Sequence, residues 1–377
     1  MSAPTGERVG VGIIGGGLMG RELACALGRW FTLESFPVRP ELVSVCDANP
    51  KALDWFRRVP VEQLTGDYQE LIANPAVEVC YVAVPHDLHQ RLYVDVVRAG
   101  KDLLAEKPFG IDLEAARAIR LAVQESGRFV RVSSEFPYFP AMHRAYQMVR
   151  SGLLGRILEV RAGFVHSSDM DPLKPINWKR QAKHCGEIGV MGDLGLHPLH
   201  VPLKLGWRPF RLYAQLQKIY DTRPDAQGHM VPCDTWDNAI LNTEILVSGA
   251  EVPMRLEMKR LSPGDTNNWY FTALGTEAGV RFTTREPRSI AIFERGKEQS
   301  WRRIDMGFET VFPVSTGKIF EAGFPDCYLQ MWAAFLAERQ GALGDRLGCV
   351  TVDEAVFSQE VFAAALASNQ KKQVITL

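Results

Sequence analysis

The stretch that decides the fold lies near the start of the chain, where Val9 to Gly20 reads V-G-V-G-I-I-G-G-G-L-M-G. An apolar strand runs into Gly15, Gly17 and Gly20 at the G-x-G-x-x-G spacing. At this spacing the first glycine permits a tight turn, the second lets backbone N–H groups approach a pyrophosphate, and the third lets a helix pack against the strand. The helix N-terminus then favours an anion. Glycine clusters also form ordinary turns, so the interpretation depends on the strands that follow.

The residues after this turn alternate strand-like apolar runs with segments of helical spacing. Strands are predicted at 41–47, 77–84, 102–105 and 129–132, and helices at 18–28, from 49, and at 67–73, 88–99 and 112–127, with an inserted loop at 30–40. Near-continuous apolar runs such as 77–84 suit parallel strands buried on both faces. The rhythm predicts an α/β fold that begins with a Rossmann domain, a doubly wound parallel sheet, over residues 1–134.

Beyond about residue 155 the pattern changes to longer strand-like runs joined by short polar turns. These runs lie at 157–166, 210–219, 239–247, 252–261, 270–274 and 289–293, and two helices are predicted at 326–340 and 351–369. The second helix opens with Thr351 and Glu354 at capping-box spacing. Strands with short connections are typical of antiparallel sheets. We therefore predict an α+β domain over residues 135–377, with a mostly antiparallel open sheet and helices on one side.

Composition narrows the class of protein. The chain has 43 basic and 44 acidic residues without a basic run, so the charge pattern of a nucleic-acid binder is missing from the sequence. No segment reaches the roughly 18 uninterrupted apolar residues of a membrane span. The seven cysteines are scattered without a C-x-x-C pair, so neither a disulfide framework nor a zinc ribbon is expected. The first strand begins too early for a secretory segment, and we expect a cytoplasmic protein without nucleic-acid or membrane partners.

Asp47 ends the second predicted strand, where an acidic side chain can accept hydrogen bonds from the hydroxyls of an adenosine ribose. A 2′-phosphate at the same place would face a carboxylate, and like charges at contact cost several kcal/mol. The sequence therefore favours NAD over NADP as cofactor. The alternative is that Asp47 only starts the D-A-N-P turn.

Glu106, Lys107 and Pro108 follow a further strand of the same sheet. Ligands of open α/β sheets bind beyond the carboxyl ends of the strands, so a lysine there can place a positive charge and three donors near a reacting hydroxyl. Such a charge stabilises a developing alkoxide. The alternative is a surface lysine beside a turn proline.

A third group of polar residues lies in G-V-M-G-D-L-G-L-H-P-L-H, which carries Asp193, His197 and His200 shortly after His184 and Cys185. An imidazole is the usual proton acceptor when an alcohol is oxidised, and a nearby carboxylate fixes its tautomer. Asp193 and His197 share a face if the segment is helical. A buried, hydrogen-bonded histidine beside a helix start is the plain alternative. Asp193, His197, His200 and Cys185 are also plausible zinc donors, but H-x-x-H is not a usual helical ligand spacing, and no metal is predicted.

Taken together, these motifs resemble the Gfo/Idh/MocA family of NAD(P)-dependent sugar and cyclitol oxidoreductases. V-A-V-P-H-D-L-H from Val82, A-G-K-D-L-L-A-E-K-P-F-G from Ala99 and G-D-L-G-L-H from Gly192 are similar to the family's signatures in order and spacing. The resemblance implies that Lys107 polarises the reacting oxygen, that His197 exchanges the proton and that Asp193 supports His197. It also implies a cis peptide between Lys107 and Pro108. The expected cofactor contacts are Gly15, Gly17, Leu18, Met19, Gly20, Asp47, Pro85, His86, His89, Glu106 and Lys107.

Three departures from the family pattern lie near the expected substrate position. Glu187-Ile188-Gly189 stands where relatives commonly carry a glycine triplet, His200 stands where many have aspartate, and S-E-F-P-Y from Ser134 replaces an N-Y-R-F-like segment. These departures bear on the identity of the substrate more than on the hydride chemistry. The expected substrate contacts are Lys107, Glu135, Tyr138, Trp178, Lys179, Asp193, His197 and His200.

The resemblance implies a dehydrogenase that moves a hydride between NAD and a ring carbon of a sugar, anhydrosugar or cyclitol. An alternative within the family is glycoside hydrolysis or epimerisation with transient redox and no net oxidation. A nucleotide sensor is less expected, because a sensor has no need of Lys107, Asp193 and His197 together. Relatives often pair through the open sheet, so we expect a homodimer or homotetramer.

Overall fold

The N-terminal sheet has seven strands in the order β17-β6-β5-β4-β1-β2-β3. The computed structural model describes residues 6–36, 38–307, 309–316 and 320–377. Six strands of this sheet are parallel, namely β1 (Glu7–Ile14), β2 (Val38–Cys46), β3 (Gln63–Thr65), β4 (Val79–Val82), β5 (Asp102–Ala105) and β6 (Val130–Val132). The predicted doubly wound parallel sheet is confirmed. β2 begins earlier than predicted, within the supposed loop at 30–40, of which residue 37 lies outside the described residues.

Helices cover both faces of this sheet and begin where the sequence supplies caps. They are α1 (Leu18–Gly28), α2 (Pro50–Asp54), α3 (Tyr68–Ala73), α4 (His89–Arg98) and α5 (Leu113–Ser126). The side chains of Asn49, Asp67 and Asp112 accept hydrogen bonds from the first turns of α2, α3 and α5. The N-cap of α1 is Gly17, which provides no side-chain cap, so the first N–H groups of α1 stay open to a ligand.

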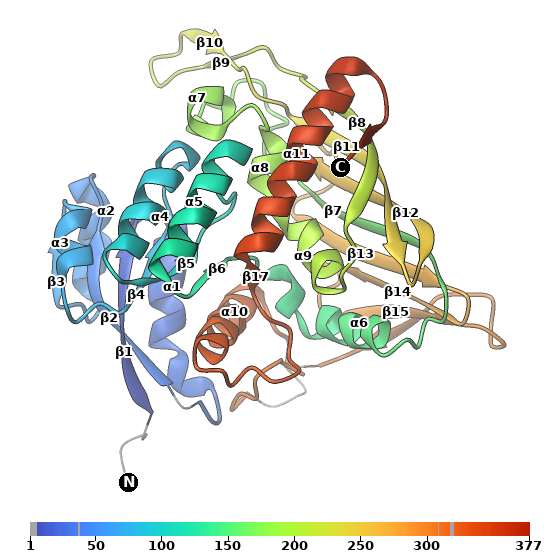
Figure 1. Ribbon diagram of the computed structural model, residues 1–377, viewed down its shortest axis with the longest axis horizontal. Coiled ribbons are helices and arrows are strands. Elements are labelled where there is room, and N and C mark those ends of the chain that lie inside the picture. The colour runs from blue at the N-terminus through green and yellow to red at the C-terminus, as the bar shows by residue number, and fades with distance from the viewer. Residues whose placement is uncertain (1–5, 37, 308, 317–319) are drawn as a thin grey trace.

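The second sheet has nine strands in the order β16-β15-β14-β13-β7-β12-β11-β8-β18, antiparallel except where β12 meets β7 (Figure 1). The strands are β7 (Ile157–Val165), β8 (Pro209–Gln217), β11 (Asn238–Val247), β12 (Ala250–Lys259), β13 (Asn268–Gly275), β14 (Ala278–Thr283), β15 (Ser289–Glu294), β16 (Arg302–Asp305) and β18 (Ile375–Thr376). β9 (Thr222–Pro224) and β10 (Met230–Pro232) form a separate hairpin. Buried and exposed residues alternate along β12, so one face packs and the other meets solvent.

The packed face of the second sheet is covered by helices on one side, as predicted. These are α6 (Pro140–Arg150), α8 (Val190–Leu194), α9 (Leu196–Lys204) and α11 (Val352–Lys371), while the short α7 (Ala182–Cys185) lies beyond them. The capping box of Thr351 and Glu354 at the start of α11 is formed. In Figure 1 α11 runs between the two sheets.

Two segments from the end of the chain return to the first sheet. α10 (Phe324–Arg339) packs against α1, and β17 (Val350–Thr351) pairs antiparallel with β6. α10 is buried almost all round, with Trp332 against Tyr81 of β4. A two-residue strand is too short to produce a sequence pattern, so the sequence does not predict β17. The domain boundary at residue 134 stays a prediction, because residues after it complete the first sheet.

Candidate functional site

A cavity of about 820 Å³ runs from the glycine-rich turn to α8 and α9. Gly15, Asp47 and Pro85 line it at the carboxyl ends of three parallel strands, and Asp193 and His197 line its far end. Loops at the carboxyl ends of parallel strands face a common crevice, which is where open α/β sheets bind ligands. The structure thus brings most of the predicted site residues into one space.

The glycine turn fits a dinucleotide pyrophosphate. Gly15 has a φ of +106°, and a Cβ there would lie 2.2 Å from the carbonyl oxygen of Ala83. A Cβ on Gly20 would lie 2.1 Å from the Gly15 carbonyl oxygen, so α1 could not pack as closely with any other residue. Nothing lies within 4 Å of the corresponding position on Gly17, which lines the cavity with Leu18 and Met19. This open space beside the first N–H groups of α1 can receive phosphate oxygens.

Asp47 starts the predicted turn and also lines the cavity. Its carboxylate accepts hydrogen bonds from Gly16 N at 2.8 Å and from Asn49 N at 2.7 Å, so it braces the glycine turn and starts the D-A-N-P turn. It also lines the cavity, where it can meet ribose hydroxyls.

Among the other expected cofactor contacts, Pro85, His86, Glu106 and Lys107 line the cavity, but His89 does not. His89 is fully buried, with its two ring nitrogens 2.8 and 3.0 Å from the carbonyl oxygens of Pro108 and Val84. The expectation of a cofactor contact is therefore corrected for His89, and also for Gly20, which packs against the glycine turn and does not line the cavity. The His89 ring braces the loops of Val84 and Pro108 from behind.

Glu106 is held by hydroxyl groups from neighbouring strands. Tyr81 Oη donates to its Oε1 at 2.6 Å and Ser133 Oγ donates to the same oxygen at 2.5 Å. Tyr328 of α10 donates in turn to Tyr81 Oη at 2.7 Å. The chain of hydrogen bonds fixes Glu106 beside Lys107, and the peptide bond between Lys107 and Pro108 is cis, as the resemblance implied.

Lys107 lies at the contact between the two halves of the chain. Its Nζ donates to the Asp193 carbonyl oxygen at 2.8 Å and lies 3.5 Å from Asp193 Oδ1. Burial lowers the pKa of this amine, but the carboxylates of Asp193, Glu106 and Glu135 outweigh burial and hold the pKa above its ordinary value. Lys107 is therefore a fixed cation at neutral pH.

The Asp193 carboxylate contacts cations rather than the histidine it was expected to support. Oδ1 accepts from Lys179 Nζ at 2.7 Å, and Oδ2 lies 3.3 Å from an Nη of Arg260. Burial raises the pKa of this carboxyl, but Lys179, Lys107 and Arg260 bring it well below its usual range. Among the described residues no hydrogen bond joins this carboxylate to His197. Burial and Lys107 lower the pKa of His197 and the Asp193 charge raises it, so the support expected from Asp193 is electrostatic rather than a direct contact.

His197 instead contacts a hydroxyl group, with Nδ1 3.2 Å from Ser134 Oγ. Its ring lies edge-on to Phe136 and Phe164, with centroids 5.0 and 5.4 Å away. Burial, together with the charge of Lys107, holds the pKa of His197 well below its ordinary value, so the ring is neutral. A neutral ring that donates Nδ1–H to Ser134 keeps Nε2 free to accept a proton.

The expected substrate contacts divide into two groups. Glu135, Trp178 and Lys179 line the cavity, whereas Tyr138 and His200 do not. Tyr138 Oη meets Cys349 Sγ at 3.6 Å, and His200 Nε2 meets the Gly348 carbonyl oxygen at 3.0 Å, both behind the cavity wall. The expectation of substrate contact is corrected for these two residues. α9 is buried on every side, so only one of its faces, that of His197, reaches the cavity.

The residues considered as zinc donors do not converge. Cys185 Sγ donates to the Gly189 carbonyl oxygen, while His200 points toward Gly348. Within the described part of the chain, no three His, Cys, Asp or Glu side chains come together as a metal site. The same residues include no helix long and apolar enough to cross a bilayer.

Sequence reasoning missed several residues of the site. Phe136, Phe164, Phe324, His166 and Asn267 line the cavity, and Ser134 and Arg260 support His197 and Asp193. These residues come from separate strands and loops with no shared spacing. Only Phe136 and Ser134 fell within a segment that the sequence singled out.

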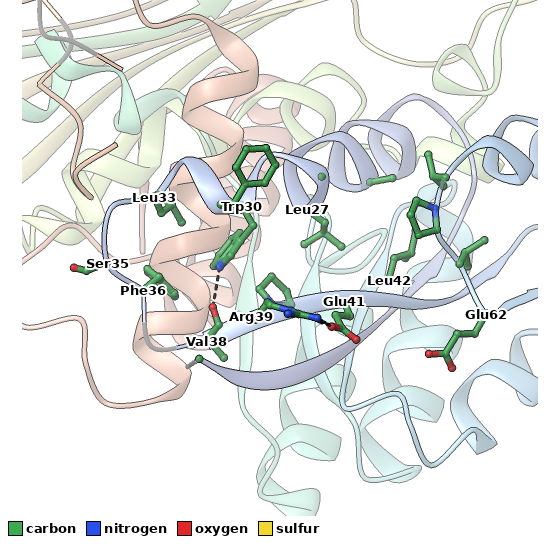
Figure 2. Close-up of a pocket in the computed structure, with 18 of the residues that line it drawn as sticks. Leu27, Trp30, Leu33, Ser35, Phe36, Val38, Arg39, Glu41, Leu42 and Glu62 are labelled. Carbon is green, nitrogen blue, oxygen red and sulfur yellow. Dashed lines mark hydrogen bonds and ion pairs between the residues drawn. The ribbon is translucent and has the colours of Figure 1, made fainter. Parts of the chain in front are cut away.

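A second, larger cavity of about 1470 Å³ lies at the opposite ends of the strands (Figure 2). The inserted segment forms one wall, and its Trp30 is anchored by a hydrogen bond from Nε1 to the Val38 carbonyl oxygen at 2.8 Å. Its charged lining residues Arg39 and Glu41 pair with each other. The insertion is therefore remote from the first cavity.

Comparison with known families decides the assignment. Residues 9–134 match the model of an oxidoreductase family with an NAD-binding Rossmann fold, and residues 142–281 match the GFO/IDH/MocA C-terminal domain. The chain belongs to the Gfo/Idh/MocA family. As a member of this family it is an NAD-dependent oxidoreductase of the dehydrogenase type, which confirms the predicted class of enzyme and its cofactor.

Relatives of this Gfo/Idh/MocA protein include proteins named as dehydrogenases. It is 28% identical over 324 residues to a levoglucosan dehydrogenase of Pseudarthrobacter phenanthrenivorans. The aligned residues cover 81% of this chain and 80% of the relative. A trans-1,2-dihydrobenzene-1,2-diol dehydrogenase of Mus musculus is 28% identical over 48% of this chain and 52% of its own. A levoglucosan dehydrogenase solved with NADH has the same fold, with a TM-score of 0.86, 23% identity and coverage of 98% of this chain and 99% of that chain.

Proposed function

We propose that the enzyme transfers a hydride between NAD(H) and a ring carbon hydroxyl or keto group of a sugar, anhydrosugar or cyclitol. One observation carries the proposal: Lys107 and His197, from the two halves of the chain, line the same cavity as the glycine turn. NAD supplies a nicotinamide carbon that accepts the hydride when an alcohol is oxidised.

The side chains at the far end can move the proton. The Lys107 ammonium donates to the reacting oxygen and stabilises its developing negative charge. The neutral His197 accepts the hydroxyl proton at Nε2 while Ser134 orients the ring through Nδ1. In the reverse direction the same imidazolium returns the proton to the carbonyl oxygen. Asp193 holds Lys107 and Lys179 at the cavity wall through the contacts described above.

The cavity wall supports a cyclic substrate with one apolar face. Phe136, Phe164 and Phe324 line the cavity near one another, with the ring centroid of Phe136 4.8 Å from that of Phe164 and 6.3 Å from that of Phe324. The charged row of Lys107, Asp193 and Lys179 contacts the same space. A ring can stack its C–H face on the aromatic side chains and present hydroxyls to the charged row. The names of the relatives, a levoglucosan and a dihydrodiol dehydrogenase, agree with ring substrates of this kind.

The assembly and location that we propose are a homodimer or homotetramer in the cytoplasm. Buried and exposed residues alternate along β11 and β12, so one side of the second sheet faces solvent, which supports pairing through this face. The seven cysteines are free, as expected in a reducing compartment. Light scattering at micromolar concentration tests the assembly, and a monomer would contradict it.

A spectrophotometric screen tests the reaction. The purified protein is mixed with NAD or NADP and with levoglucosan, other anhydrosugars, pyranoses, inositols or cyclic diols, while the absorbance of the reduced nicotinamide is followed. We expect NADH to accumulate with a ring substrate. Loss of substrate without NADH would instead favour the hydrolase or epimerase alternative, and product analysis by NMR would separate these two.

A further inference from the structure

Arg260 lies directly behind the proposed reaction site. It follows β12 and is 0% exposed, so it does not line the cavity and cannot touch a substrate. A fully buried guanidinium is costly unless its donors are matched by acceptors. Its surroundings therefore show what it stabilises.

The guanidinium of Arg260 connects segments that are far apart in the sequence. One Nη lies 3.3 Å from Asp193 Oδ2 and 3.7 Å from Cys185 Sγ. The other donates to the carbonyl oxygens of Lys179 at 3.1 Å and Trp236 at 3.5 Å. Two of these four partners belong to residues on the cavity wall, Asp193 and Lys179.

These contacts restrict how the Asp193 carboxylate can turn. Oδ2 is held by Arg260, so Oδ1 faces the two ammonium groups, 2.7 Å from Lys179 Nζ and 3.5 Å from Lys107 Nζ. The same guanidinium fixes the backbone from which the Lys179 side chain extends. Without it, the carboxylate could rotate toward one lysine and release the other.

We propose that Arg260 is a positioning residue for the reaction, which orients Asp193 and the Lys179 backbone so that Lys107 is held at the reacting oxygen. The inference rests on the proposed function. The inference goes beyond the proposed function by assigning a role in turnover to a residue outside the cavity.

Arg223 provides a matched control. It is also buried, at 2% exposure, and its guanidinium donates to the carbonyl oxygens of Asp169, Asp171 and Lys174. Its described hydrogen bonds do not involve Asp193, Lys179 or Lys107. A general loss of stability from removing a buried arginine should therefore occur in both variants, whereas the loss of orientation should occur in only one.

The test compares Arg260→Gln, Arg260→Lys and Arg223→Gln in the full-length enzyme with its best ring substrate. We expect kcat to fall about 10²-fold in Arg260→Gln, the scale of a small misplacement of a catalytic group, with KM for NAD unchanged. Arg260→Lys should lose less, and Arg223→Gln should keep its kcat. Asp193→Asn alone and Asp193→Asn combined with Arg260→Gln should lose nearly the same activity. Both substitutions disrupt the same pair of contacting side chains, so their effects should not add. Equal loss of kcat in Arg223→Gln and Arg260→Gln, or additive losses in the double variant, would overturn the proposal.

A second measurement is independent of activity. Crystal structures of the wild type and of Arg260→Lys without substrate should show the Asp193 carboxylate rotated in the variant and the distance from Lys107 Nζ to Oδ1 increased. An unchanged arrangement overturns the inference even if the enzyme is active. If the wild type oxidises none of the ring substrates, the proposed function fails, whereas the crystallographic result still decides the role of Arg260 in holding Lys107. Should Arg260→Gln not fold, Arg260→Lys carries both comparisons.

Discussion

Lys107 and Asp193 meet across the two halves of the chain, with the lysine Nζ 2.8 Å from the aspartate carbonyl oxygen and 3.5 Å from its Oδ1. The contact joins the end of β5 to the last turn of α8. A cation contributed by one half is thus oriented by an anion of the other. The charge and the position of the amine both depend on this contact.

Replacing Lys107 by methionine should reduce kcat by about 10²–10⁴-fold, because the developing charge on the substrate oxygen loses its electrostatic partner. Steady-state kinetics on the best substrate measures the effect. Lys101→Met is the control, since Lys101 Nζ donates to the Asn74 carbonyl oxygen, away from the cavity. Turnover of Lys107→Met equal to that of the control would remove Lys107 from the mechanism.

The pH dependence of kcat/KM should reflect the depressed pKa of His197. Because burial and the Lys107 charge keep this imidazole neutral, the proton-accepting form persists through neutral pH and is lost only well below the ordinary histidine range. We expect activity to fall on the acid side, at a lower pH than it would for an exposed histidine. His197→Ala should lose most activity, while His229→Ala on the exposed hairpin should not. A His197→Ala profile identical to that of the wild type would exclude this base.

Glu135 should make the wild type less stable as the pH rises. Burial, with a contribution from Glu106, raises the pKa of its carboxyl to about 7, above the ordinary value of 4.5. The folded state therefore binds more protons than the unfolded state between these values, and the free energy of unfolding falls as pH rises through this window. The free energy of unfolding of Glu135→Gln should rise relative to that of the wild type as the pH goes from 5 to 8. The rise should be up to about 3 kcal/mol, because one pKa unit corresponds to about 1.4 kcal/mol. Denaturation curves that give the same difference in stability between variant and wild type at pH 5 and at pH 8 would contradict the prediction.

Asp47 should control the choice between NAD and NADP. Asp47→Ser should raise kcat/KM with NADP relative to NAD by about 10-fold or more, because a like-charge contact costing several kcal/mol is removed. Asp54→Ser on the exposed side of α2 is the control. An unchanged cofactor ratio in Asp47→Ser would show that the carboxylate only braces the turn through Gly16 and Asn49.

The parts of the site that follow strand ends could be predicted from sequence. Gly15 and Asp47 come directly after a parallel strand and Lys107 two residues after one, and topology alone brings such positions together. Their local motifs also determine their orientation. The assignment of the two halves to parallel and mostly antiparallel sheets followed from strand length and spacing in the same way.

Long-range partners could not be predicted. Asp193 lies four positions before His197, which suggested a shared helical face, but in the fold its carboxylate contacts Lys179 and Arg260. His200 and Tyr138 have the right chemistry, yet they lie on the side of their segments that faces Gly348 and Cys349. Which face of a buried helix meets a cavity depends on packing that residue spacing does not encode.

The return of α10 and β17 to the first sheet limits how this enzyme could be re-engineered. A polypeptide truncated after β6 would leave an unprotected strand edge and bare the apolar side of α1, inviting aggregation. Exchanging cofactor preference by transplanting the nucleotide-binding half between relatives would require the recipient's α10 and β17 to be replaced as well. The two ends of the polypeptide must be treated as a single module.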